Sequence, residues 1–118
     1  MDRRLIGQRA EERAATFLRE HGCKVVLRNF RRRCGELDIV ARERGVLVVA
    51  EVRLRSREDY GGAAASIDAH KRTRIVRTTQ LLLQRHREFA RLPVRFDVLV
   101  VHEDREPAVE WIRHAFEA

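Results

Sequence analysis

The stretch from Gly35 to Arg55 constrains the fold of this chain more than any other. It consists of two short runs rich in Val, Ile and Leu, one on each side of a charged turn at residues 42–45. Short apolar runs bounded by turn residues are typical of β-strands, so the stretch predicts a β-hairpin. Each strand carries an acid where an apolar residue is expected, Asp38 in the first and Glu51 in the second. The hairpin is therefore expected to bring two carboxylates together.

Side chains alternate between the two faces of a strand, so Arg53 is expected on the same face as Glu51. Carboxylates on adjacent strands are costly to bury unless positive charge compensates them, and oxygen ligands suit a hard divalent cation. One interpretation of the pattern is therefore a metal site. The other is an edge hairpin whose acids face solvent and pair with arginines, because charged residues on the open face of a strand are ordinary.

An acid on one strand, followed by a Glu-x-Lys-like tripeptide at the end of the next, resembles the PD-(D/E)XK signature of restriction-endonuclease-like nucleases. More closely, the chain is identified as a member of the YraN-like family of small uncharacterised proteins related to archaeal Holliday-junction resolvases. The motifs that carry the resemblance cover nearly the whole chain. In order they are Gly7-x-x-Ala10-Glu11-x-x-Ala14, Arg28-Asn29-Phe30, Gly35-Glu36-Leu37-Asp38, Glu51-Val52-Arg53-x-Arg55, Tyr60-Gly61, Lys71, Arg95-Phe96-Asp97-Val98, Trp111-Ile112 and Ala115-Phe116.

The resemblance implies an α/β fold of the restriction-endonuclease-like type, a three-layer sandwich with a central mixed β-sheet flanked by helices. It also implies a metal-dependent endonuclease that hydrolyses phosphodiester bonds in DNA, with branched or junction DNA as a candidate substrate. In that case Glu11, Asp38 and Glu51 would bind Mg²⁺ or Mn²⁺. The metal would polarise the phosphate and activate a water.

Arg53 departs from the general nuclease pattern because it stands where the motif usually has lysine. Arginine stays protonated near neutral pH, so it cannot act as a general base, although it can hold the scissile phosphate. This departure keeps an alternative open, namely a catalytically inactive nucleic-acid-binding or accessory module of a DNA-processing complex. A partner-binding subunit of a larger DNA-processing machine is a third interpretation.

The formal net charge of +7 and a pI of about 10.8 fit an anionic partner, with DNA first among the candidates. Nearly all the basic residues are arginine, which resembles a genome-wide compositional preference, so clustering carries more weight than abundance. Basic residues cluster before the first acidic strand, after the second and at the start of a later helix. A phosphate backbone that approaches two carboxylates needs such a surround. Nucleic-acid contacts are predicted at Arg31, Arg32, Arg33, Arg55, Lys71 and Arg72.

Apolar residues recur at helical spacing over residues 6–21 and predict an amphipathic helix that ends at Gly22. Glu11 lies on the flank of its apolar stripe. The helix pattern alone favours a surface carboxylate paired with an arginine, whereas in the resolvase-like relatives the equivalent glutamate reaches the metal centre. A second helix is predicted from a cap at Ser66 or Asp68 to about residue 91.

Lys71 falls in the first turn of this second helix, where free backbone N–H groups favour anions. It is one of only two lysines in the chain. Phosphate contact and a plain solvated lysine are both consistent with its position. Glu36 is expected on the same face as Asp38, either as a supporting acid or in a salt bridge to the preceding arginines. Asp97 fits the family pattern, or it pairs with an arginine or caps a turn.

The remaining segments are assigned by their patterns. Strands are predicted at 24–29, 94–102 and 108–112, a basic connection at 29–34, a mobile loop beside the site at 58–65 and a helical tail at 113–118. Trp111 and Phe116 are expected to pack on the core. Tyr60, in the loop, would pack there or stack on an unpaired base.

A length of 118 residues suits one domain over 1–118. The chain has no run of 18 or more apolar residues and does not open with a charged and then apolar leader, so a soluble, cytoplasmic protein with no membrane partner is expected. Cys23 and Cys34 lack zinc-site spacing and are expected to be reduced. Because resolvase relatives act as dimers, the resemblance also raises a homodimer, for which the sequence shows no face.

Overall fold

The computed structural model describes residues 2–55, 67–103 and 106–118. In chain order, its elements are α1 (Arg3–Glu20), β1 (Lys24–Arg32), β2 (Gly35–Glu43), β3 (Val46–Arg55), α2 (Ala69–Arg85), a short 3₁₀ helix η2 (Arg87–Phe89), β4 (Val94–His102) and β5 (Val109–Phe116). The predicted loop at 58–65, with Tyr60, lies outside the described residues.

The five strands form one mixed sheet in the order β1-β2-β3-β4-β5. Three neighbouring pairs are antiparallel, namely β1 with β2, β2 with β3, and β4 with β5. Only β3 and β4 are parallel, from Leu47↔Val94 to Arg55↔His102. A parallel pair needs a long connection between its strands, and here α2 lies in that connection.

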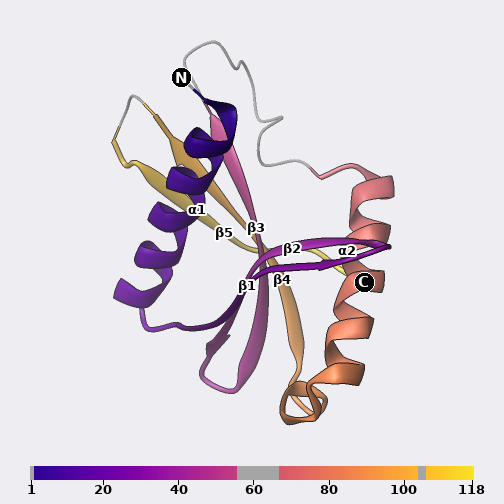
Figure 1. The fold of residues 1–118 in the computed structure, drawn as a ribbon. Helices are drawn as coiled ribbons and strands as arrows, with labels where there is room; N and C mark the ends of the chain where they lie inside the picture. Colours follow the sequence, from indigo (N-terminus) through magenta and orange to yellow (C-terminus); the bar gives the residue numbers. More distant parts are fainter. Residues whose placement is uncertain (1, 56–66, 104–105) are drawn as a thin grey trace.

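The two main helices lie on opposite faces of the sheet, which gives three layers (Figure 1). Alternation along β3 divides the core between them. Val48 and Ala50 pack in the cluster that includes Ala14 and Leu18 of α1. Leu47 and Val49 pack in the opposite cluster, which includes Ile75 and Leu82 of α2. The predicted three-layer α/β sandwich with a central mixed sheet is confirmed, and its arrangement is consistent with the restriction-endonuclease-like type.

The sheet forks where β2 leaves β3. The two strands pair from Glu43↔Val46 only as far as Ile39↔Ala50, while β1 and β2 stay paired to Arg32↔Gly35. Beyond the fork, residues 29–38 form a two-stranded arm that extends over α2 (Figure 1). Asn29, across from Asp38 on β1, has a φ of 53°, a left-handed conformation that asparagine tolerates better than most residues. The arm therefore begins at Asp38.

The arm packs tightly on α2 at Gly35. A Cβ built on this residue would lie 2.8 Å from Thr78 Oγ1 and 3.4 Å from the carbonyl oxygen of Arg74. Glycine is therefore required at the start of β2 for the arm to come this close to the helix. The same threonine donates a hydrogen bond to the Arg74 carbonyl over 2.8 Å and lies 3.4 Å from the thiol sulfur of Cys34.

Several predicted boundaries were wrong. Residues 29–32 continue β1 instead of forming a connection, and 113–116 continue β5 instead of a helical tail. The first helix begins at Arg3 because the Asp2 carboxylate accepts a hydrogen bond from the Arg4 amide. The second ends at Arg85, before a separate 3₁₀ turn. None of the described helices has the length and apolarity needed to cross a membrane.

Candidate metal centre at the fork of the sheet

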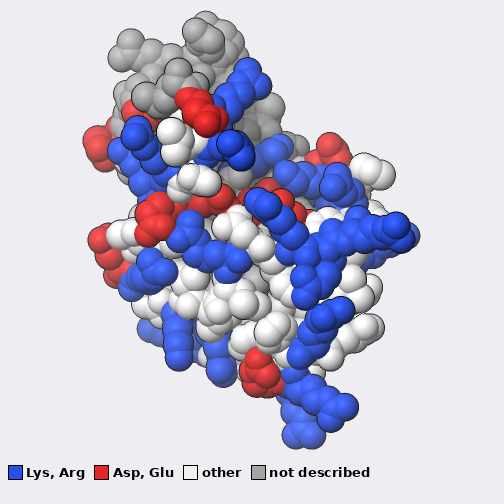
Figure 2. Space-filling view, in the orientation of Figure 1, with Lys and Arg blue, Asp and Glu red and all other residues white. Residues whose placement is uncertain are grey.

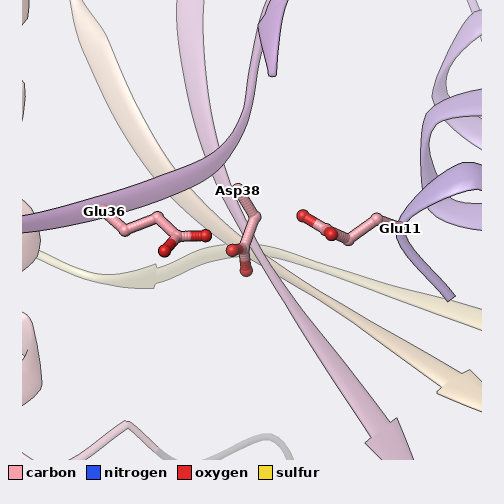
Figure 3. Close-up of side chains that lie close together, drawn as sticks. All are labelled: Glu11, Glu36 and Asp38. Atoms are coloured by element: carbon pink, nitrogen blue, oxygen red, sulfur yellow. The ribbon is translucent and has the colours of Figure 1, made fainter. Parts of the chain in front are cut away.

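Three carboxylates from two elements converge at the fork. Glu11 comes from α1, and Glu36 and Asp38 come from β2, and one oxygen atom from each lies within 4.8 Å of the others. Figure 3 shows Asp38 between the other two side chains, with Glu11 approaching from the helix and Glu36 from the arm. Glu51 is the fourth acid, because its negative charge and its hydrogen bond with Asp38 both raise the Asp38 pKa. We refer to these four residues as the acidic centre.

Asp38 is held by the backbone of the strand that β2 leaves. Its Oδ2 accepts a hydrogen bond from the Val52 amide over 2.9 Å, beyond the point where β2 and β3 stop pairing. Burial raises the pKa of Asp38 to about 8, and the negative charge of Glu51 adds to the effect, against the opposing hydrogen bond from Val52. In the absence of a cation this carboxyl is therefore held largely protonated at neutral pH.

Glu11 lies beside the buried residues Ala10 and Ala14 of α1, and the helix directs it toward the sheet. Burial raises the pKa of its carboxyl, and Arg28 opposes this shift. One of its oxygens, Oε1, is buried and has no hydrogen-bond partner among the described residues. The neighbouring Glu12 is exposed and ion-paired with Arg28, whose hydrogen bond lowers the Glu12 pKa. Of the two adjacent acids, Glu11 is the one that enters the centre.

Glu51 lies on the α2 side of the sheet and is buried. Its Oε1 is 2.9 Å from the Lys71 Nζ, which reaches it from the first turn of α2. This turn is fixed by Asp68, whose carboxylate accepts a hydrogen bond from the Lys71 amide over 2.8 Å. Asp68, one of the two residues predicted as the cap, is therefore the N-cap of α2. Arg53 follows on the same face of β3, half-buried.

Glu36 lies beside the other acids and also forms the predicted salt bridge. It belongs to the acidic centre, and its Oε2 is 3.2 Å from the Arg31 Nε. Both side chains of this pair are exposed, so the pair contributes little to stability. Its position means that one arginine of the arm already faces the carboxylates.

The other predicted basic residues lie on the arm, at the end of β3 and in α2. Arg32 and Arg33 are exposed near the tip of the arm, and the Arg32 guanidinium lies 4.2 Å from the centre of the Phe30 ring. Arg55 is half-buried at the end of β3, and Arg72 is exposed beside Lys71. Figure 2 shows basic side chains over much of one face, with acidic groups among them across its middle.

One residue near the centre was not among the predicted site residues. Arg28 on β1 is partly buried, pairs with Glu12 and acts on the charge of Glu11. Its Nε is buried without a hydrogen-bond partner in the described part of the chain. Its place in the Arg28-Asn29-Phe30 motif was the one sequence signal that could have identified it. Its contact with α1 could not be predicted, because that contact depends on how the helix packs on the sheet.

Asp97 has a structural role. The side chain is fully buried and accepts hydrogen bonds from Arg95, from the Trp111 Nε1 over 2.8 Å and from the His114 amide over 2.9 Å. The last two bonds tie β5 to β4 at the register shift between Phe96 and Val98. The alternative in which Asp97 pairs with an arginine is therefore confirmed.

The fold and the site together define a small α/β protein whose mixed sheet forks at a cluster of four carboxylates. The chain belongs to the uncharacterised protein family UPF0102, whose profile matches residues 10–101. This confirms the YraN-like family predicted from the sequence.

Curated relatives match almost end to end. A UPF0102 protein of Alcanivorax borkumensis is 45% identical over 112 residues, which is 93% of this chain and 90% of the relative. One from Nitrosomonas europaea is 42% identical and covers 94% and 92% of the two chains. One from Halorhodospira halophila is 45% identical and covers 98% and 89%. The similarity thus extends over both helices and all five strands.

Proposed function

We propose that the protein is a metal-dependent endonuclease that hydrolyses phosphodiester bonds in DNA, with branched or junction DNA as the candidate substrate. The observation that carries the proposal is the convergence of Glu11, Glu36 and Asp38 within 4.8 Å, with Glu51 beside them. Carboxylates packed this closely repel one another unless protons or cations intervene. A centre made only of oxygen donors suits a hard divalent ion.

The residues present fit Mg²⁺ or Mn²⁺. The buried Oε1 of Glu11 lacks a hydrogen-bond partner in the described residues, which is costly for a polar atom unless another group binds it. Glu11, Asp38 and Glu51 would hold the ion, and Glu36, which lies within 4.8 Å of the first two, would join them. When bound, the ion supplies Lewis-acid polarisation of the phosphate and a water of lowered pKa.

The protein's own residues would position the DNA strand. Arg53, on the same face as Glu51, would contact the scissile phosphate and stabilise negative charge that develops on it. Arg32 and Arg33, exposed on the arm, would contact phosphates further along the strand. Arg55 and Arg72 would add to this basic surround. In this proposal the carboxylates hold the ion, Arg53 acts at the scissile phosphate, and the other arginines position the DNA strand.

The test is cleavage of a panel of labelled linear, single-stranded, flapped and four-way-junction DNAs with Mg²⁺, Mn²⁺ or EDTA. We expect metal-dependent cleavage that falls at least about 1,000-fold in Asp38→Asn, because the central ligand is lost. Glu20→Gln is the matched control, since it removes one negative charge from an exposed site on α1 and should leave the rate unchanged.

Two results would overturn the proposal. One is cleavage that survives in Asp38→Asn, which would indicate a contaminating nuclease. The other is DNA binding without cleavage under any metal, which would identify the protein as the binding or accessory module that the arginine at position 53 left open.

A further inference from the structure

Lys71 is the basic side chain that directly contacts a carboxylate of the acidic centre from α2. Its Nζ lies 2.9 Å from the Glu51 Oε1, and the Glu51 side chain is only 9% exposed. The Lys71 side chain is itself partly accessible, with 37% of it exposed. The contact therefore joins a buried acid to a cation that still has a route to solvent.

The position of this contact makes it sensitive to a bound metal. A divalent ion on the Glu51 carboxylate would lie close to the ammonium, and like charges at such separations repel strongly where water is scarce. Lysine has a flexible four-carbon stem and three donors that can turn to a new acceptor. An ion entering the centre and the ammonium of Lys71 therefore compete for the same oxygen.

We propose that Lys71 is an internal counter-ion that exchanges with the metal. It neutralises Glu51 while the centre holds no cation, and it turns to a phosphate oxygen of the DNA when Mg²⁺ takes the carboxylate. This inference rests on the proposed function for the identity of the second acceptor. It assigns the lysine of the site to α2, whereas Arg53 stands at the lysine position of the motif on β3.

The exchange can be observed without any cleavage, because the chain has only two lysines. Protein grown with ¹³C-lysine gives two Cε signals, and Lys24, exposed at the start of β1, is the internal reference. On titration with Mg²⁺ we expect the Lys71 signal to move and the Lys24 signal to stay. Glu51→Gln without metal should shift the Lys71 signal in the same direction and remove the response to Mg²⁺.

The proposal fails if the Lys71 signal stays still while Mg²⁺ shifts the backbone amides of Asp38 and Val52. It fails equally if Mg²⁺ perturbs nothing at the centre. A Lys71 signal that moves as far in Glu51→Gln as in the wild-type protein would also overturn it, because the response would not pass through Glu51.

Cleavage assays separate this inference from the proposed function. We expect Lys71→Ala to lower the metal-dependent rate about 100-fold, Lys71→Arg to restore part of it through its charge, and Lys24→Ala to leave it unchanged. Wild-type cleavage with an unmoved Lys71 signal would refute the exchange alone. A moving signal without cleavage of any substrate would refute the nuclease and leave the counter-ion exchange standing.

Discussion

At the scale of single residues, Asp38 makes the stability of the metal-free protein depend on pH. Its pKa is raised to about 8, above the ordinary value of 3.8, because the carboxyl is buried beside Glu51. The folded state therefore binds this proton more tightly than the unfolded state. Its contribution to stability is complete below about pH 4 and is lost as the pH rises toward 8.

This shift predicts the behaviour of Asp38→Asn, which cannot lose a proton. In EDTA, the variant should gain little over the wild type at pH 4 and on the order of 2 kcal/mol or more at pH 8, measured as the free energy of unfolding in urea. Glu20→Gln, at an exposed site on α1, is the matched control for the substitution itself. A gain of equal size at every pH would show that Asp38 does not titrate in this range.

Elsewhere, individual acids serve the fold. Asp97 illustrates this, because its buried carboxylate is satisfied by the Arg95 guanidinium, an indole N–H and a backbone amide. Glu43 is half-buried. Burial tends to raise the pKa of its carboxyl, but hydrogen bonds from Arg95 and Arg113 hold that pKa below the usual range. Asp97 and Glu43 share the Arg95 Nη2, so their oxygens are satisfied by a cation, whereas the buried Oε1 of Glu11 has no hydrogen-bond partner among the described residues.

At the scale of elements, the contact between the arm and α2 positions the acidic centre. Gly35 leaves no room for a side chain, because its Cβ would lie 2.8 Å from Thr78 Oγ1. The threonine is fully buried, so it cannot swing into solvent to make space. The glycine in the Gly35-Glu36-Leu37-Asp38 motif is thus a packing requirement of the arm.

A double-mutant cycle tests this contact. Gly35→Ala should lower the free energy of unfolding by about 1 to 3 kcal/mol through overpacking, and Thr78→Ala by about 1 kcal/mol through a lost hydrogen bond. Together they should cost at least about 0.5 kcal/mol less than the sum, since the clashing hydroxyl is gone. Strictly additive losses would mean that the two residues do not compete for space.

The control for this cycle is Gly7→Ala. Gly7 lies in α1, and a Cβ added there would meet nothing within 4 Å, so alanine should stabilise the helix by up to about 1 kcal/mol. A loss of stability at both glycines would point to a general effect of alanine on this chain rather than to the arm.

The elements that sequence could predict are those with a regular apolar pattern on a core face. The Leu47 to Ala50 run and the alternation after Val94 indicated β3 and β4 because both are buried within the sheet. Residues 29–32 and 113–116 were misassigned because they belong to the two edge strands, where polar residues dominate and no alternation marks the fold.

The candidate site divides in the same way. Glu11, Asp38 and Glu51 could be named from motifs. The hairpin predicted that Asp38 and Glu51 lie close together, whereas the approach of Glu11 was implied only by the family resemblance. The ion pair of Lys71 with Glu51 could not, because it depends on where the first turn of α2 lies over the sheet. The same holds for Arg28, whose contact with α1 is set by packing across layers.

At the scale of the whole molecule, the excess positive charge is spread over many arginines, so its local effect has to be measured. DNA affinity should fall with salt, and each phosphate contact adds about 0.9 to the slope of log K against log salt on duplex DNA. Replacing Arg31, Arg32 and Arg33 together by glutamine should reduce that slope by about 2, because Arg31 already faces Glu36.

The matched control changes the same net charge on α1, which lies on the opposite face of the sheet from α2 (Figure 1). Arg3, Arg4 and Arg13 are exposed there. Their triple glutamine variant should keep a slope close to that of the wild type. Equal reductions of the slope in the two variants would show that DNA binding depends only on total charge. That result would contradict a defined interface on the arm.

The fork also has a mechanical consequence. On one side of the fork, five strands are joined edge to edge. On the other side the strands form two branches, the arm and the β3-β4-β5 part, which no longer pair with each other although both pack in the core cluster that includes α2. Side chains from both branches meet at Asp38 and the Val52 amide. A ligand held by Glu36 on one branch and Glu51 on the other would cross-link the two branches. The divided sheet should therefore become more rigid as more of the protein binds the ligand.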